Sequence, residues 1–343
     1  PDREERYATV ADFAEELEPF LGDPKRGVRE LSVIVGHADD EEEEETETAP
    51  PVPYVPLRER ITPLQRTVAA HAAGALGSVA FVALANLPQI GGLEGIFGLA
   101  GPALLLFWGL FALVTLAGAL KPHLGALLAY FALSAALIAG NAPAAGCVLL
   151  AATAAWWYFT GRLGDADANA TLVPPLAGAF GCNQLTPLVA GFCLPPARAF
   201  GALAFSLVVS VMLAACGSHS LLGWDALTNW QFSAGLDVQA SIGSLLMQPA
   251  LWCIVISWIA ATGALSAFRL RPTRAFAVLG TLVASALLLA GIVLAAWVAS
   301  GQATWMPSFN NLVFTLVPIV AMLLMCVLVP EPDYYEEDYE GEA

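Results

Sequence analysis

The pattern of hydrophobic residues along this chain predicts a set of membrane-spanning helices. A helix needs about 20 apolar residues to cross a hydrocarbon core of ~30 Å. Eight runs meet this length, at 67–87, 96–120, 123–140, 143–160, 197–216, 249–268, 275–299 and 311–329. The connections among the first four are mostly short. We therefore expect an all-α, polytopic membrane protein with about eight transmembrane helices.

A further apolar stretch, residues 172–196, is interrupted and predicts a re-entrant hairpin. Pro174, Pro175 and Pro187 lie inside it, and a polar tripeptide stands at its midpoint. Proline lacks the backbone N–H that an uninterrupted helix uses. Two arms of roughly ten residues each would cover about 15 Å, half of the hydrocarbon core. The arms would then enter and leave the membrane at the same side.

The tip of this hairpin is the candidate site within the membrane region. It consists of Cys182, Asn183 and Gln184. The two amides can satisfy the backbone groups that the prolines leave free, or they can contact a transported solute, as half-helix ends do in transporters. His71, near the start of the first span, and Asn86 are the other polar candidates, and we interpret His71 as an interfacial residue.

The distribution of basic residues favours the hairpin over a full span. If residues 172–196 turn back, every lysine and arginine falls on the side of the N-terminal region. The loops at 88–95, 141–142, 217–248 and 300–310 then contain neither residue. Positive residues concentrate on the cytoplasmic side of membrane proteins. We expect a plasma-membrane protein with both termini in the cytoplasm, and an aromatic segment within 217–248 at headgroup depth on the other side.

The composition agrees with a protein that lies mostly in lipid. Hydrophobic residues make up 57% and charged residues 13% of the chain, more apolar surface than one soluble core could bury. The net charge of −16 comes mainly from carboxylates within 2–59 and 331–342. This argues against nucleic acid as a partner and makes the lipid bilayer the expected one. The six cysteines lack the spacing of a metal site, so we predict neither metal ligands nor disulfides.

An amphipathic helix is predicted before the membrane region. Thr9 and Asp12 have the spacing of a capping box, and Val10, Phe13 and Leu17 then recur on one helical face. An acidic block and alternating prolines follow, which is typical of an extended, solvated spacer. We divide the chain into the helical region 1–31, a linker with a basic juxtamembrane segment at 32–66, the membrane domain 67–330, and an acidic tail at 331–343.

The run PDREERYATVADFAEELEPFL resembles the last helix of a bacterial, eukaryotic-like serine/threonine protein kinase domain. The matching positions keep the family's spacing: Arg6, Tyr7, Thr9, Asp12, Phe13 and Leu17. Four residues separate Pro1 from Arg6, where the family usually has two. The resemblance implies that Arg6 pairs with a glutamate elsewhere in the kinase domain, and that Phe13 and Leu17 pack structurally.

The resemblance covers about 21 residues and includes no catalytic motif. It implies that a longer parent chain binds ATP and Mg and phosphorylates protein substrates, whereas these residues alone contain no catalytic, cofactor or metal site. We expect sequence upstream of Pro1, because the chain begins without methionine or signal peptide. The sequence leaves open a transporter or channel-like membrane protein, a sensor without catalysis, and a homodimer.

Overall fold

The computed structural model describes residues 63–84, 102–140, 142–217, 224–228, 237–271 and 274–328. The chain divides into two compact units, Pro1–Tyr54 and Val55–Ala343, and all described residues belong to the second. The kinase-like positions Arg6, Phe13 and Leu17, the linker up to residue 62 and the acidic tail therefore lie outside the described residues. Predictions about them stay predictions. Residues 63–66, which the sequence predicts as the end of the linker, belong instead to the first described helix.

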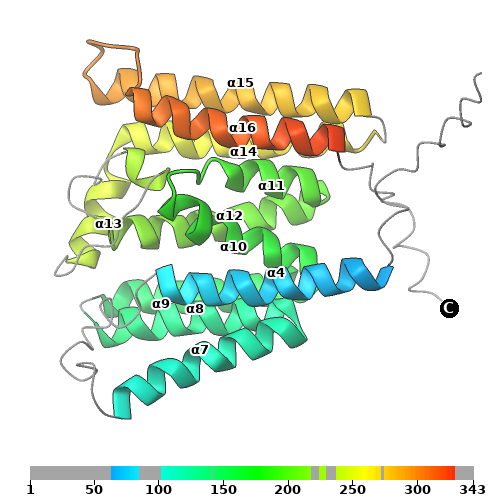
Figure 1. The fold of residues 1–343 in the computed structure, drawn as a ribbon. Coiled ribbons are helices and arrows are strands. Elements are labelled where there is room, and N and C mark those ends of the chain that lie inside the picture. The colour runs from blue at the N-terminus through cyan, green and yellow to red at the C-terminus, as the bar shows by residue number, and fades with distance from the viewer. Residues whose placement is uncertain are drawn as a thin grey trace, which may run out of the picture. The chain divides into compact units, whose positions relative to one another are not determined.

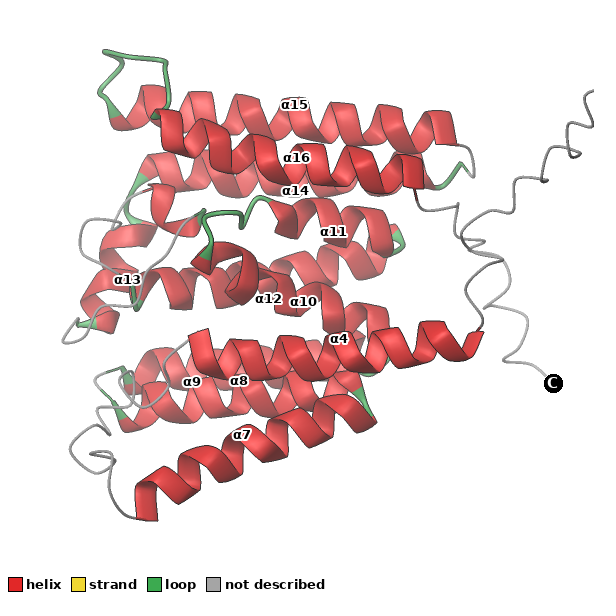
Figure 2. Cartoon of the chain, viewed as in Figure 1, coloured by secondary structure: helices red, strands yellow, loops and turns green. Residues whose placement is uncertain are grey.

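The described residues are all-α. They form eleven α-helices and two short turns of other helical types, and no β-strand occurs among them (Figures 1 and 2). In chain order the elements are α4 (Pro63–Leu84), α7 (Pro102–Leu120), α8 (Pro122–Ala139), α9 (Pro143–Trp156), the π-helical η2 (Trp157–Gly161), α10 (Asp165–Ala179), α11 (Leu185–Cys193), α12 (Pro196–Ala215), the 3-10 turn η4 (Trp224–Leu227), α13 (Val238–Leu246), α14 (Pro249–Arg269), α15 (Arg274–Ala299) and α16 (Phe309–Leu328).

Seven of these helices are long and apolar enough to cross a membrane. They are α4, α8, α9 with its η2 extension, α12, α14, α15 and α16. The span that the sequence predicts at 96–120 corresponds to α7, whose apolar stretch Phe107–Leu120 is shorter than the others. The prediction of a polytopic membrane protein is confirmed, with seven candidate spans in the described part of the chain.

Proline sets where many of the helices begin. Six of them start at a proline, namely α4, α7, α8, α9, α12 and α14. The first turn of a helix has no use for the N–H that proline lacks, and the fixed φ of proline already suits a helix. This is why the predicted starts at 123, 143, 197 and 249 lie within one residue of the observed ones.

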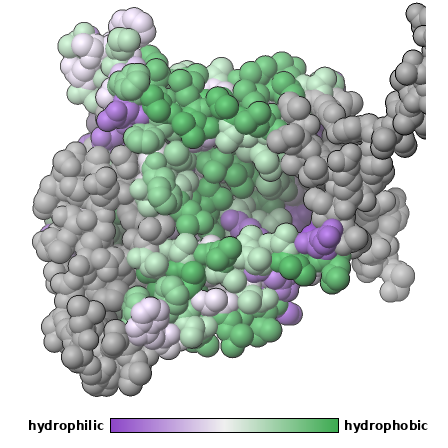
Figure 3. Space-filling model, viewed as in Figure 1, coloured by the Kyte–Doolittle hydropathy of each residue, from purple (hydrophilic) through white to green (hydrophobic). Residues whose placement is uncertain are grey.

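The helices run side by side in three groups. α4, α7, α8 and α9 pack together, α14, α15 and α16 form a second group, and α10, α11 and α12 lie between them (Figure 1). The buried core is continuous through the groups and includes Tyr130 of α8, Leu203 of α12 and Trp258 of α14. On the face seen in Figure 3, the surface of the helices is mostly hydrophobic. Ile256 of α14, for example, is 64% exposed, as expected of a side chain that contacts lipid.

The two ends of this bundle differ in charge. We call one end the basic end; α4 and α12 start there and α14 ends there (Figure 1). We call the opposite end the α13 end; α9 and α14 start there and α12 ends there. All lysines and arginines among the described residues lie at or near the basic end: Arg66, Lys121, Arg162, Arg198, Arg269, Arg271 and Arg274.

Candidate functional site

The helix α10 contains both Pro174 and Pro175, so the first arm of the hairpin differs from its prediction. It has 15 residues and begins at Asp165, seven residues before the predicted arm. Pro175 cannot donate to the carbonyl of Thr171, its partner four residues back. The hydroxyl of Tyr130, on α8, donates to this carbonyl oxygen instead, at 2.7 Å. A neighbouring helix therefore replaces the lost hydrogen bond, and α10 continues through its prolines.

The chain reverses at residues 180–184, where the sequence predicts the break. Gly181 has φ of +76°, a conformation that disfavours a side chain. The N–H of Cys182 donates to Ala177 O at 2.6 Å and that of Gly181 to Gly178 O at 3.1 Å, the pattern of a Schellman helix end. A Cβ on Gly181 would also lie only 3.0 Å from the ring of Phe314 on α16. The backbone conformation therefore favours glycine at this position, and a larger residue would also press on the ring of Phe314.

Asn183 is fully buried and joins three segments of the bundle. Its Nδ2 donates to the carbonyl of Leu227 at 2.6 Å and to the hydroxyl of Ser210 at 3.1 Å. Its Oδ1 accepts from the hydroxyl of Thr186 at 2.7 Å. Its backbone N–H donates to Thr228 O at 3.3 Å. Every donor and acceptor of this side chain is therefore used by protein.

Gln184 is also fully buried, and its partner comes from α14. The indole Nε1 of Trp258 donates to Gln184 Oε1 at 2.7 Å. The other amide atom, Nε2, has no hydrogen bond within the part of the chain that the structure describes. Cys182 is half-buried, and its thiol contacts the carbonyl of Phe180 at 3.5 Å. The three predicted tip residues therefore lie together, with the two amides buried.

The positions of the partners give the depth of the tip. Ser210 lies 14 residues after Pro196 on α12, which is about 21 Å along the helix axis. Trp258 lies 11 residues before Arg269 on α14, about 16 Å along that axis. Both distances start from the basic end. The tip therefore lies well inside helices about 30 Å long, at the middle of α14 and about two thirds of the way along α12.

The turn η4 approaches the tip from the α13 end. Ala226 and Leu227 are fully buried, and the carbonyls of Leu227 and Thr228 accept the bonds from Asn183. The sequence predicts Leu227 within a segment at headgroup depth, whereas the structure packs it into the bundle. The local sequence could not distinguish a buried segment from one at headgroup depth, because aromatic and polar residues alternate in the same way in either environment. Burial raises the pKa of the Asp225 carboxyl, while hydrogen bonds from its own N–H and that of Ala226 act in the opposite direction.

An ion pair and a cation–π contact hold the base of the hairpin. The carboxylate of Asp167 is fully buried, and its Oδ2 accepts from Arg198 Nη1 at 3.3 Å, which joins α10 to α12. The guanidinium of the buried Arg269 lies 4.3 Å from the ring centroid of Phe192, which joins α14 to α11. Both arms are thus fixed at the basic end as well as at the tip.

A second polar cluster lies beside the start of α10. Asp165 is 3.8 Å from His71 Nε2 and 3.7 Å from His123 Nδ1, and His71 Nδ1 lies 2.8 Å from Ala119 O. His71 thus contacts α7 and α10, and its interfacial position stays a prediction. Among the described residues, no three His, Cys, Asp or Glu side chains are grouped so that they could hold a metal ion.

The arrangement at the tip is suited to fixing a backbone reversal. The groups that surround it are amides, hydroxyls, an indole and backbone carbonyls, and none of them is a nucleophile paired with a base. Tyr130, Ser210 and Trp258 were not predicted as partners, because each is distant in sequence and ordinary within its own helix. Thr186 could have been found, since it follows Asn183 by three residues at a helix start.

Comparison with known proteins gives no relative for this chain. No protein-family model, no curated protein and no solved structure matches it.

Proposed function

We propose that residues 67–330 form a membrane anchor in which the α10–α11 hairpin is re-entrant and permanently packed. The observation that carries this proposal is the closure of the tip, where all polar groups of the Asn183 side chain bond to protein. A hairpin that binds a solute needs free polar groups and a path for water. The tip of α10–α11 instead uses its amides to satisfy neighbouring backbone and side chains.

The anchor serves a serine/threonine protein kinase in this proposal. The support is the resemblance of residues 1–21, with Arg6, Phe13 and Leu17 in structural roles. The full-length parent would bind ATP and Mg and phosphorylate protein substrates on the side of the membrane where the N-terminal region lies. The basic end of the bundle supports a cytoplasmic location for that side, in the plasma membrane, with both termini cytoplasmic.

The kinase assignment is tested with the complete reading frame. Membranes that contain the full-length protein are incubated with labelled ATP, and label on protein serine and threonine is measured. Membranes that contain residues 1–343 alone are the matched control. We expect incorporation only with the full-length protein. An upstream sequence without a glycine-rich loop and a catalytic-loop aspartate would refute the assignment.

A transporter or channel-like protein is the second candidate, and one observation favours it. Two non-helical segments, the hairpin tip and the region of η4, meet near the middle of the bundle, as broken helices do at transport sites. The buried Nε2 of Gln184, which has no bond to a described residue, would be the group available to a solute.

Water access at Cys182 distinguishes the two candidates. Its half-buried thiol lies beside Phe180, which is 69% exposed, so both would face acyl chains in a packed anchor. A variant that retains only Cys182 is treated with a charged maleimide from each side of the membrane. We expect no labelling from either side. Rapid labelling from one side, together with unchanged stability after loss of the Asn183 amide, would favour transport.

A further inference from the structure

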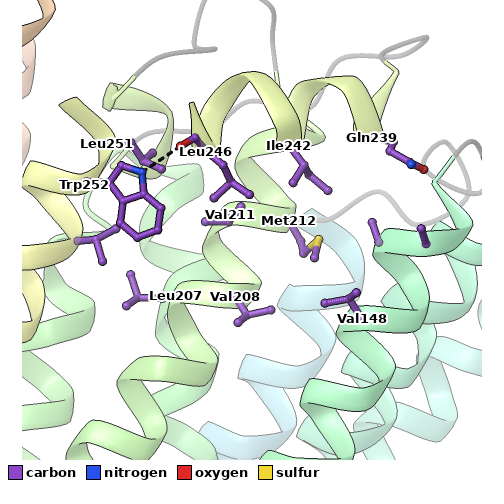
Figure 4. A pocket seen from close by; sticks show the side chains of 13 residues that line it. Val148, Leu207, Val208, Val211, Met212, Gln239, Ile242, Leu246, Leu251 and Trp252 are labelled. Atoms are coloured by element: carbon purple, nitrogen blue, oxygen red, sulfur yellow. Dashed lines mark hydrogen bonds between the residues drawn. The ribbon is translucent and has the colours of Figure 1, made fainter. Parts of the chain in front are cut away.

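A cavity of about 520 Å³ opens at the α13 end (Figure 4). Four helices line it: α9, α12, α13 and α14. Its volume is within the range of ligand sites in proteins, which are about 300 to 1,000 Å³. The packed anchor has no evident use for this space, so the cavity needs a separate explanation.

The lining is almost entirely hydrophobic. Val208 and Val211 of α12 form its floor, and the side chains of Ile242 and Leu246 on α13 point toward this floor (Figure 4). Gln239 is the one residue with a polar functional side chain apart from the indole of Trp252, and no residue that lines the cavity carries a charge. A carboxylate or phosphate would find no cation among these residues. The occupant must therefore be an uncharged, apolar group.

The depth of the cavity matches one leaflet of a bilayer. Val255 lies six residues after the start of α14, about 9 Å along the helix. Leu207 lies eight residues before the end of α12, about 12 Å along it. Half of a ~30 Å hydrocarbon core is about 15 Å. The cavity therefore occupies the depth at which acyl chains of the leaflet at this end lie.

The cavity is open at the side of the bundle, where lipid would lie. Val148 and Trp252 belong to its wall and are 57% and 47% exposed, so lipid can reach it from the side. α13 covers the end of the cavity, and it has only nine residues, too few to span a membrane. The side chain of Asp237 caps its N-terminus by accepting from Ala240 N at 3.1 Å. The indole of Trp252 donates to Leu246 O at 2.9 Å and ties the other end of α13 to α14 (Figure 4).

The geometry points to a binding site for one acyl chain of a neutral membrane lipid. The chain enters between α9 and α14 and lies on Val208 and Val211. The headgroup remains at the level of α13, beside Gln239. This site does not depend on the kinase assignment, because it needs only the membrane helices.

Photolabelling of the purified chain in lipid nanodiscs tests this site. The probe is a phosphatidylcholine with a diazirine in one acyl chain, and labelled peptides are located by mass spectrometry. We expect label in the segments that contain Val211 and Ile242, at a severalfold higher level than around Ile256, which is lipid-facing but outside the cavity. Equal label at all three would mean contact with bulk lipid only and would overturn the proposal.

Variants that fill the cavity provide the second arm. Val211→Trp places a larger side chain in the cavity from α12, and Ile242→Trp does so from α13. Ile256→Trp is the matched control. We expect the two cavity variants to lose label severalfold while the control keeps it. Unchanged label in a folded cavity variant would contradict the site, and so would crosslinks to a second copy of the chain. Excess phosphatidylcholine should compete, and a free fatty acid that competed equally would contradict the choice of a neutral lipid.

Discussion

The hydroxyl of Tyr130 donates to the carbonyl of Thr171, 41 residues away, at a place where Pro175 has removed the helix's own donor. Both residues are fully buried. This bond satisfies the carbonyl that Pro175 leaves free, and it links α8 to the hairpin. A carbonyl deprived of it would be left in an apolar environment without water.

Tyr130→Phe should therefore destabilise the bundle. The ring and its packing are retained, so the loss reflects the hydroxyl alone, and an unsatisfied buried polar group costs about 1 to 3 kcal/mol. Thermal unfolding in detergent measures the effect. Tyr158→Phe is the matched control, because Tyr158 is 61% exposed and its ring contact with Arg162 does not need the hydroxyl. Equal stability of the two variants would contradict this role of Tyr130.

The two amides at the tip should differ in their importance. Asn183→Leu removes the bonds to the carbonyl of Leu227 and to the hydroxyls of Ser210 and Thr186. Each of these groups that forms no replacement hydrogen bond should lower the free energy of unfolding by about 1 to 3 kcal/mol. Gln184→Met costs less, because only the bond from Trp258 is lost and the Nε2 donor is removed with it. Unfolding in detergent ranks the variants, with the exposed Asn310→Leu as control. The reverse order would show that the tip is not held as described.

The pair Asp167–Arg198 should show energetic coupling between α10 and α12. Asp167 is fully buried, while the Arg198 side chain is 33% exposed, so solvent weakens the pair. A double-mutant cycle of Asp167→Asn and Arg198→Gln should give a coupling of about 0.5 to 3 kcal/mol. The cycle uses thermal unfolding in detergent at two salt concentrations. A coupling of zero would mean that the pair does not hold the base of the hairpin.

Asp225 should make the stability fall as pH rises. The folded state raises the pKa of this carboxyl, chiefly by burial. Its contribution to stability is then fully present below the unfolded pKa of about 3.9 and is lost as pH rises through the folded pKa. Asp225→Asn removes this dependence, so the stability of the variant relative to wild type should increase from pH 4 to pH 7. A decrease over the same range would contradict the burial of the carboxylate.

The two ends of α15 should be accessible from opposite sides of the membrane. Single cysteines at Leu270 and Ala303, both exposed, are placed in a cysteine-free protein. We expect a membrane-impermeant maleimide to label Ala303→Cys in intact cells and Leu270→Cys only after permeabilisation, because the proposed orientation places the basic end in the cytoplasm. The opposite pattern would invert the proposed orientation.

The sequence by itself determined the helical class, most of the helix boundaries and the place of the chain reversal. Apolar runs of spanning length, prolines at helix starts and the polar tripeptide at 182–184 are local signals, and each acts through the chain's own backbone. The one-sided distribution of arginine and lysine also lies in the sequence. It favours an even number of crossings between the clusters, which a hairpin that turns back would give.

Tertiary structure decided what the hairpin contacts. The sequence indicates that Pro175 leaves a carbonyl free, but nothing near it identifies Tyr130 as the donor. In the same way, Asn183 could have faced a solute, and the packing of Ser210 and Leu227 around it is what closes the tip. The lipid-facing cavity at α13 likewise arises from four helices that are separated along the chain. Hydrogen bonds and cavities depend on which helices become neighbours, and a local pattern of apolar residues is nearly the same for any neighbour.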